Sequence, residues 1–395
     1  MEEWKEYKLG EVAIPVRDRI DTSVLDASSY ISTENMLPDK AGVTLSSGIP
    51  SGKAIQFKDG DVLISNIRPY FKKIWRADKV GGCSADVICL RATKEIEPLF
   101  LYYLLSQDLF FDYVMQGAKG TKMPRGDKNQ IMQWPVFLPT KSEQRIIASI
   151  LSALDGKIET NRRINDNLEQ QAQALFKSWF VDFEPFKEGE FEETKQGMIP
   201  KGWKASSLED ITAQKSERVG DRDDVKVLSP VTTGELMLSE EYFTKQVFSE
   251  SIAKYKVVKS GDFAYNPARV NIGSLGRNNY DFDGCVSPVY VVFSCKDGYA
   301  HLFDLYRKTE KFKTEVNLRA IGGVRQSLNY KDFAFIQCIV PPHRVVEEFN
   351  AIYEHLLVMQ KHTKEESERL ASLRDTLLPR LMSSELKVNE IENVI

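Results

Sequence analysis

The chain has 395 residues, 42% of them hydrophobic and 28% charged, with a formal net charge of −4 at pH 7. This composition excludes a largely disordered chain and predicts a folded protein with two or more domains. No stretch approaches the ~18 consecutive apolar residues of a membrane span, so we expect neither a secretory signal nor a membrane partner. The five cysteines form no CxxC pair and predict free, buried thiols in a cytoplasmic protein.

Charge is distributed unevenly along the chain. The net negative charge argues against nucleic-acid binding in general, because phosphate contacts require Lys and Arg. In residues 67–79, however, every charged residue except Asp78 is basic, and these basic residues lie beside Tyr70, Phe71 and Trp75. This mixture suits a phosphate backbone, although Phe71 and Trp75 fit a hydrophobic core equally well. The charged residues of 182–193 are acidic except Lys187, and this segment predicts a solvated linker.

One pattern occurs twice, at an offset of about 200 residues, which indicates an internal repeat. The matching pairs in chain order are Trp4-Lys5 with Trp203-Lys204, Gly60-Asp61 with Gly261-Asp262, Asn66 and Arg68 with Asn266 and Arg269, Gly82-Cys83 with Gly284-Cys285, and Leu138-Pro139 with Val340-Pro341. Each half therefore predicts the same globular domain. The proline that ends each domain disfavours helix before it and marks the start of a long helical pattern.

Each long helix shows apolar residues at alternating three- and four-residue steps, the pattern of a coiled coil. The first seam is Ile147, Leu151, Leu154, Ile158, Asn161, Asn165, Leu168, Ala172, Leu175 and Trp179, and the second is Ile352, Leu356, Met359, Thr363, Leu370, Leu373 and Leu377. Both seams are polar near the centre, with Thr363 and Glu366 in the second. Antiparallel pairing matches the polar centres and the apolar ends. The alternative is that each helix packs only on its own globular half.

The predicted fold is α+β, with two similar globular domains joined by two long antiparallel coiled-coil helices in a pseudo-two-fold repeat. The expected boundaries are 1–141 for the first domain, 142–182 for the first helix, 183–200 for the acidic linker, 201–341 for the second domain, 342–383 for the second helix and 384–395 for a tail.

Asparagine and arginine recur in loops that contain glycine. Arg contacts guanine in a bidentate manner, and Asn contacts adenine in the same way. Two such domains suit a two-part duplex target, and the differing loops predict two different half-sites. The predicted DNA contacts are Asn66, Arg68, Lys72, Lys73, Arg76, Lys122 and Arg125 in the first half and Asn266, Arg269, Asn271, Arg277, Arg325 and Gln326 in the second. For each residue alone, a solvated surface or turn-capping role fits at least as well.

The segment GDVLISNIRPYFKKIW and the helix that follows LPTKSEQR resemble the first target-recognition domain and first helical region of type I restriction-modification specificity subunits. Pro139, Glu143-Gln144, Leu154-Asp155, Asn161 and Trp179-Phe180 carry most of this resemblance. The second half, from IPKGW to the helix ending DTLLPRLMSSEL, resembles the second recognition domain and helical region. There, Val346-Glu347-Glu348 stands near the place of the Glu-Gln pair.

The resemblance implies a non-catalytic chain that directs adenine N6 methylation carried out by another subunit. Its implied partners are double-stranded DNA, two methyltransferase subunits and restriction (endonuclease/translocase) subunits. S-adenosylmethionine and ATP would then belong to the partners, and we expect no catalytic or metal-binding residues in this chain. Apolar residues beside the first seam leave more surface than one helix covers, which predicts binding of the methyltransferase. These residues are Ile146, Ile150, Phe176, Phe180 and Val181.

Two other classes of protein stay open at this point. A structural coiled-coil adaptor would use the helices without any DNA contact. A self-sufficient adenine methyltransferase is suggested by Asn266-Pro267, the start of an Asn-Pro-Pro-aromatic motif, but Ala268 and Arg269 follow instead of the second proline and the aromatic residue. Neither half shows a strand followed by a glycine-rich cofactor loop of the usual kind.

Overall fold

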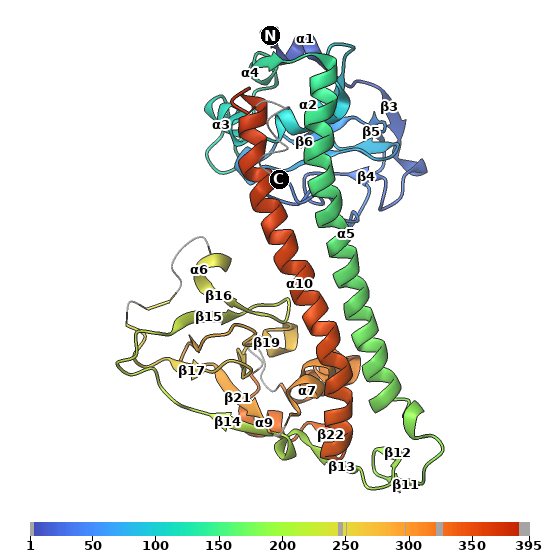
Figure 1. Ribbon diagram of the computed structural model, residues 1–395, viewed down its shortest axis with the longest axis vertical. Helices are drawn as coiled ribbons and strands as arrows, with labels where there is room; N and C mark the ends of the chain where they lie inside the picture. The colour runs from blue at the N-terminus through green and yellow to red at the C-terminus, as the bar shows by residue number, and fades with distance from the viewer. Residues whose placement is uncertain (1–3, 244–247, 250, 297, 321–326, 387–395) are drawn as a thin grey trace. The chain divides into compact units, whose positions relative to one another are not determined.

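The computed structural model describes residues 4–243, 248–249, 251–296, 298–320 and 327–386 (Figure 1). The chain divides into two compact units, Met1–Arg162 with Lys364–Ile395, and Arg163–Thr363. Each unit consists of one globular domain and parts of the two long helices, α5 (Lys141–Phe180) and α10 (His343–Met382). Both helices begin and end within two residues of the ranges that the sequence predicts.

The described residues of the first domain form two four-stranded sheets and one two-stranded sheet. Its strands are β1 (Lys5–Lys8), β2 (Ala13–Pro15), β3 (Arg19–Asp21), β4 (Tyr30–Ile31), β5 (Lys53–Phe57), β6 (Val62–Ser65), β7 (Ile74–Arg76), β8 (Gly81–Cys83), β9 (Val87–Ala92) and β10 (Pro135–Leu138). One sheet has the order β2-β9-β6-β7 and the other β3-β5-β8-β4, with β4 parallel to β8. β1 pairs with β10, the strand that leads into α5.

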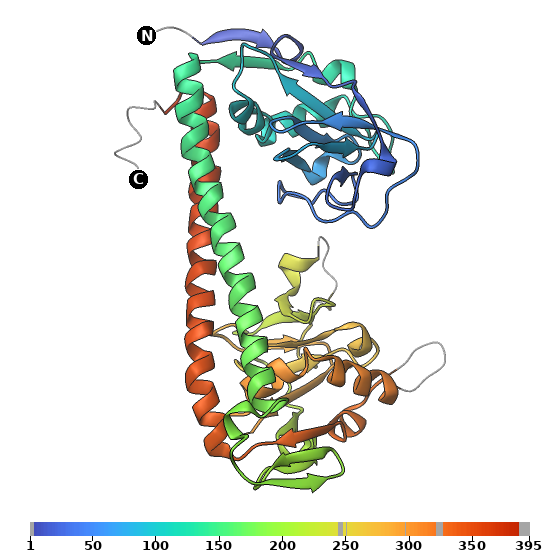
Figure 2. The same ribbon diagram turned by 90° about the vertical axis from the view of Figure 1, so that its right-hand side faces the viewer.

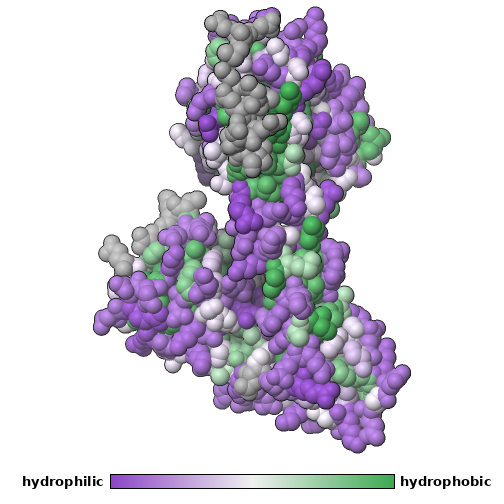
Figure 3. Space-filling model, in the orientation of Figure 1, coloured by the Kyte–Doolittle hydropathy of each residue, from purple (hydrophilic) through white to green (hydrophobic). Residues whose placement is uncertain are grey.

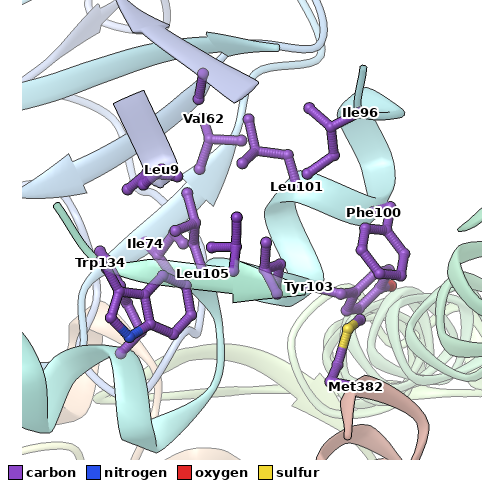
Figure 4. Packing of buried hydrophobic residues seen from close by; sticks show 14 of the residues in the cluster. Leu9, Val62, Ile74, Ile96, Phe100, Leu101, Tyr103, Leu105, Trp134 and Met382 are labelled. Atoms are coloured by element: carbon purple, nitrogen blue, oxygen red, sulfur yellow. The ribbon is translucent and has the colours of Figure 1, made fainter. Parts of the chain in front are cut away.

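Helices cover this domain and close its core. They are α1 (Leu9–Val12), η1 (Thr22–Val24), η2 (Pro69–Phe71), α2 (Pro98–Leu105), α3 (Asp108–Gln116) and α4 (Lys128–Ile131). All four residues of β6 are buried, which identifies it as a central strand. Figure 4 shows the apolar side chains of this core, with Met382 of α10 beside Phe100 and Tyr103 of α2. The last turns of α10 therefore form part of the first domain's core.

The second domain repeats the plan of the first. Its strands are β11 (Phe191–Thr194), β12 (Gly197–Pro200), β13 (Lys204–Ser207), β14 (Thr212–Lys215), β15 (Lys226–Pro230), β16 (Leu236–Leu238), β17 (Lys256–Val258), β18 (Phe263–Tyr265), β19 (Leu275–Arg277), β20 (Gly284–Val286), β21 (Val291–Cys295) and β22 (Gln337–Val340). Its helices before α10 are η3 (Glu184–Phe186), η4 (Leu208–Asp210), α6 (Ser239–Tyr242), η5 (Val270–Ile272), α7 (Ala300–Tyr306), α8 (Glu310–Arg319) and α9 (Tyr330–Ala334).

Strand pairing confirms the internal repeat. The order β14-β21-β18-β19 in the second domain corresponds to β2-β9-β6-β7 in the first, and β13-β22 corresponds to β1-β10. In the remaining sheet, the three strands β17-β20-β15 correspond to β5-β8-β4, including the parallel pair. The fourth strand differs, because β3 extends one edge in the first domain and β16 the opposite edge in the second. The two domains thus share a framework and vary at its edges.

Each long helix begins immediately after an edge strand. The capping box of α5 joins Thr140 and Glu143, since the backbone N–H of Glu143 donates to Thr140 Oγ1 and that of Thr140 to Glu143 Oε2, at 3.3 and 3.0 Å. The buried Gln144 then ties the helix to its domain, because its Oε1 accepts from the backbone N–H of Glu97 at 2.9 Å. The Glu-Gln pair of the sequence motif therefore fixes where and in what direction α5 starts.

The two long helices are antiparallel within each unit (Figures 1 and 2). In the first unit, Asp155 pairs with Arg374, and Asn161 Nδ2 donates to Glu366 Oε2 at 2.7 Å. In the second unit, Thr363 Oγ1 donates to Asn165 Oδ1 at 2.6 Å, and nearer the end of α5 the rings of Phe180 and Phe349 lie 4.8 Å apart. The predicted pairing of polar centre with polar centre is confirmed.

Two details of the sequence prediction are wrong. On α10, Ile352 and Met359 are exposed, and the buried stripe follows Val346, Phe349 and Tyr353, because the helix presents the aromatic residues to the second core. Residues 183–200 do not form a simple solvated linker. They fold into η3 and the β11-β12 hairpin, since Phe183 and Ile199 are buried beneath their acidic neighbours.

The five cysteines are free, and all except Cys295 are buried, as the sequence predicts. Burial raises the pKa of Cys285 to about 11 and that of Cys338 to about 12, so both stay protonated at neutral pH.

We predict that Asp155→Ala weakens the attachment of both long helices to the first domain. Asp155 accepts a hydrogen bond from the Tyr103 hydroxyl at 2.7 Å and from Arg374 Nη1 at 2.8 Å, both partly buried. Removing the carboxylate leaves the Tyr103 hydroxyl and Arg374 Nη1 without their acceptor, and we expect a loss of about 1–3 kcal/mol in the free energy of unfolding, measured with urea. Asp375→Ala is the matched control, because it contacts Arg374 from the exposed side and should cost about 0.5 kcal/mol. Equal effects of the two variants would contradict this assignment.

Candidate nucleic-acid interface

The connection from β6 to β7 carries several of the predicted contact residues. Asn66 follows β6 directly, and Arg68 adopts a left-handed backbone, with φ of 51°, immediately before η2. Asn66 is 8% exposed, and within the described residues neither its Oδ1 nor the buried Nε of Arg68 has a hydrogen-bond partner. Buried polar atoms usually are bonded, so two unsatisfied ones in one loop indicate a place where a ligand supplies the missing partners.

A second loop, residues 118–127, lies against this connection. The backbone N–H of Arg68 donates to the carbonyl of Pro124 at 2.8 Å, and that of Gly126 donates to the carbonyl of Asn66 at 3.3 Å. A Cβ on Gly126 would lie 2.8 Å from Val114 Cγ1 and 3.0 Å from Asn66 Oδ1, so glycine is required for this close approach. The structure therefore brings Asn66 and Arg68 together with Arg125, which lies far along the sequence from both.

The basic side chains of the first domain differ in their surroundings. Lys122 is exposed, and Arg125 pairs with Asp86 at 3.3 Å across the surface. Lys72 pairs with Asp108 at 3.0 Å. Lys73 donates to the carbonyl of Thr33 at 2.8 Å, and burial followed by the nearby charge of Arg68 lowers the pKa of Lys73. Lys122 and Arg125 are thus the most accessible of the four to a phosphate.

Arg76 and Arg277 do not join the loop residues. Arg76 pairs across the sheet with Val62, at the end of β7 away from η2, and its guanidinium contacts Asp59 at 3.6 Å. Arg277 occupies the same place in the second domain, where its Nε donates to the carbonyl of Gly261 at 3.2 Å. Each arginine thus lies at the end of its strand that is farther from the turn, and its predicted contact with DNA stays a prediction.

The second domain builds a corresponding turn with other side chains. Asn266 Oδ1 accepts from the backbone N–H of Ala268 at 3.0 Å, and the exposed Arg269 precedes η5 as Arg68 precedes η2. Asn271 lies within η5. The backbone N–H of Leu328 donates to the carbonyl of Pro267 at 3.1 Å, so here too the later loop contacts the turn. Arg325 and Gln326 lie outside the described residues, and their predicted role stays a prediction.

Sequence reasoning missed two supports of the first loop. Asp61 holds Arg91 through two hydrogen bonds of 2.8 and 2.7 Å, which fixes β6 to β9. Hydrogen bonding to Asp61 raises the pKa of Arg91, although burial opposes it. The equivalent Asp262 faces no matching arginine because β21 has Ser294 at the place of Arg91, and burial raises the pKa of Asp262. The second support of the first loop is the turn at Asp39 and Lys40. The only sign of this turn in the sequence is the proline at 38.

Only some of the residues predicted to bind a partner are exposed. Phe176 and Phe180 are 4% and 8% exposed and pack against Trp203 and Phe349 in the core of the second unit, so their prediction as an exposed patch was wrong. Both rings are part of this chain's own hydrophobic core. Ile146 and Val181 are exposed and Ile150 is half-buried, and their contact with a partner stays a prediction. Figure 3 shows small apolar patches over the long helices on one face.

In the described ranges, no three His, Cys, Asp or Glu side chains cluster as metal ligands would. No helix among these residues is both long and apolar enough to cross a membrane.

Two related α+β domains, each with a double-loop contact region, and an antiparallel helix pair form the architecture that the sequence resemblance to DNA specificity subunits predicts. Comparison with known proteins supports this class. Residues 1–170 match the family described as the type I restriction modification DNA specificity domain. The chain is 27% identical over 308 residues to the type I restriction enzyme MjaIX specificity subunit of Methanocaldococcus jannaschii, covering 74% of this chain and 70% of that protein.

A second relative, the type I restriction enzyme HindI specificity subunit of Haemophilus influenzae, is 23% identical and covers 98% of this chain and 100% of its own. The crystal structure of the type I restriction-modification system S subunit from M. genitalium has the same fold, with a TM-score of 0.56, 15% identity and 96% of each chain covered. Residues 1–170 thus match the model of the predicted family, and both relatives that extend beyond these residues are named as specificity subunits of type I restriction enzymes. These matches also agree with the predicted role of a DNA sequence-recognition subunit.

We predict that Lys122→Ala combined with Arg125→Ala weakens DNA binding and flattens its salt dependence. Each lost phosphate contact should reduce the slope of log K against log salt by about 1. Fluorescence anisotropy with a labelled duplex, between low and moderate salt, measures both quantities. Lys94→Ala is the control, since its exposed side chain lies on the β9-α2 connection and not in the contact loops. An unchanged slope in the double variant would place the phosphate contacts elsewhere.

Proposed function

We propose that this chain reads a bipartite, asymmetric duplex DNA target, one half-site for each domain, and carries methyltransferase subunits on its long helices. The observation that supports this most directly is the double-loop contact region, which the chain builds twice. In each domain the turn after a central strand is bonded to the loop that precedes a short helix, through Arg68 and Pro124 in the first and Pro267 and Leu328 in the second.

The side chains on these two turns differ, although the framework is the same. The first turn has Asn66-Ile67-Arg68-Pro69, and the second has Asn266-Pro267-Ala268-Arg269. Direct readout depends on the placement of donors and acceptors against base edges. Two turns that hold Asn and Arg at different spacings therefore suit two different DNA words, which accounts for an asymmetric target.

The proposal assigns the chemistry to the partners. Two methyltransferase subunits would bind S-adenosylmethionine and methylate adenine N6, and restriction subunits would use ATP. The exposed apolar residues Ile146 and Val358 on the long helices, and Val181 directly after α5, offer contact points for such partners. The protein would act in the cytoplasm, where it has access to chromosomal DNA.

We predict that replacing residues 1–140 with the first domain of another specificity subunit changes one half of the methylated sequence and leaves the other half intact. The reason is that the first double-loop region lies entirely within these residues. Mapping methylated adenines across the genome, in cells that express the chimaera together with the methyltransferase subunit, measures the outcome.

The reciprocal exchange of residues 201–341 is the matched control and should change only the other half. The donor domain should keep the apolar residues that contact Leu377 and Leu381 of α10, so that its core closes. A chimaera that alters both halves at once would contradict independent reading. The absence of any chain-dependent methylation in cells with the native protein would contradict the proposed function itself.

A further inference from the structure

The turn around η2 in the first domain holds two exposed aromatic rings. Tyr70 is 47% exposed and Phe71 37% exposed, and their ring centroids lie 4.7 Å apart at an angle of 53°. Pro69, the first residue of η2, is buried and anchors the turn below them. Large apolar side chains are usually covered, so a pair of rings presented together indicates a contact surface.

The backbone beneath the rings is strained. Arg68 and Lys72, on either side of η2, have φ values of 51° and 49°, in the left-handed region that non-glycine residues rarely adopt. Asp39 and Lys40, with φ of 52° and 64°, lie against the same turn. Backbone strain of this kind costs about 1–3 kcal/mol per residue and gathers at functional sites. The second domain has Gly273 at the place of Lys72, where a positive φ is free of this cost.

Two neighbouring segments hold the strained turn in place. The backbone N–H groups of Asp39 and Lys40 donate to the carbonyls of Phe71 and Lys72 at 2.9 and 3.1 Å. Asp108, the first residue of α3, accepts from both Lys40 and Lys72 at 3.0 Å. Partial burial opposes ionisation of Asp108, but the hydrogen bonds from the two lysines outweigh it and lower the pKa of Asp108. The ion pairs are therefore intact at neutral pH, and the rings are preorganised.

The charges around the rings favour a nucleic acid as the occupant. Lys73 Nζ lies 5.8 Å from the centre of the Phe71 ring, and Arg68 flanks the turn on the other side. Lys40 and Lys72 share the single carboxylate of Asp108, so the three side chains together keep a net positive charge. An aromatic pair surrounded by positive charge suits DNA, because the rings can contact the bases and the cations can contact the phosphates.

Resting on the proposed function, we propose that Tyr70 and Phe71 form a wedge that enters a base step of the first half-site and unstacks it. Apolar wedges kink duplex DNA at the cost of unstacking, and pyrimidine–purine steps unstack most easily. The first domain then reads part of its half-site through the deformability of one step. The second domain has Asn271 and Ile272 at these places and lacks the ring pair.

The test uses the assembled enzyme with its methyltransferase subunit and duplexes that contain the methylated target found by mapping. 2-Aminopurine, placed at successive positions of the first half-site, reports unstacking by increased fluorescence. We expect an increase at one pyrimidine–purine step apart from the methylated adenine. Tyr70→Ala with Phe71→Ala should abolish that increase and weaken binding roughly 10-fold or more.

Two further variants separate the wedge from a general loss of structure. Tyr70→Trp keeps a planar ring and should retain the fluorescence increase. Leu109→Ala, at an exposed apolar residue of α3 in the same domain, should change neither fluorescence nor affinity. Any signal at the methylated adenine itself should persist in every variant, because the partner subunit acts there.

The outcomes distinguish this inference from the proposed function. If the double alanine variant binds within twofold of the native protein and keeps the same fluorescence profile, the wedge is overturned while DNA recognition stands. If the native assembly shows no preference for the mapped target over an unrelated duplex, the proposed function fails as well.

Discussion

The structure depends on an exchange of apolar helix ends between the two halves of the sequence. The core of the first domain includes Leu377, Leu381 and Met382, which belong to the helix that starts at the second domain. The core of the second unit includes Phe176 and Phe180 from the helix that starts at the first. Neither globular half is complete without residues from the other half's helix. Burial of large aliphatic and aromatic side chains, about 1.5–3 kcal/mol each, therefore holds the chain together.

Between these apolar ends, the helix pair is polar. Asn161, Asn165, Thr363 and Glu366 join the two helices by hydrogen bonds near the middle. Polar residues in a coiled-coil seam reduce stability but specify register, because a shifted register would leave them unpaired. The chain thus obtains its stability from the helix ends and its alignment from the centre.

The same framework supports two contact regions of different character. In the first domain, a left-handed lysine and ion pairs around Asp108 hold an aromatic turn. In the second, Gly273 permits the turn without strain, and Asn266 closes it with its own side chain. A duplicated domain can change what it reads by exchanging a few residues at such a turn, since the strands beneath it stay the same.

The sequence by itself determined the repeat, the long helices, their antiparallel pairing and the family. The helices and their pairing follow from local spacing, namely a proline before each helix and apolar residues at three- and four-residue steps. The repeat follows from matching motifs about 200 residues apart, and the family from the resemblance of those motifs. It also identified Asn66, Arg68 and Arg125 as candidates, but their meeting depends on Gly126 and Pro124 in the folded chain. Only the tertiary structure decided that Phe176 and Phe180 are internal and that Arg76 and Arg277 lie away from the turns. Helical and strand periodicity indicate that a residue lies on an apolar face or in a hairpin. They do not indicate which distant segment covers that face, because that contact is made between residues far apart in the sequence.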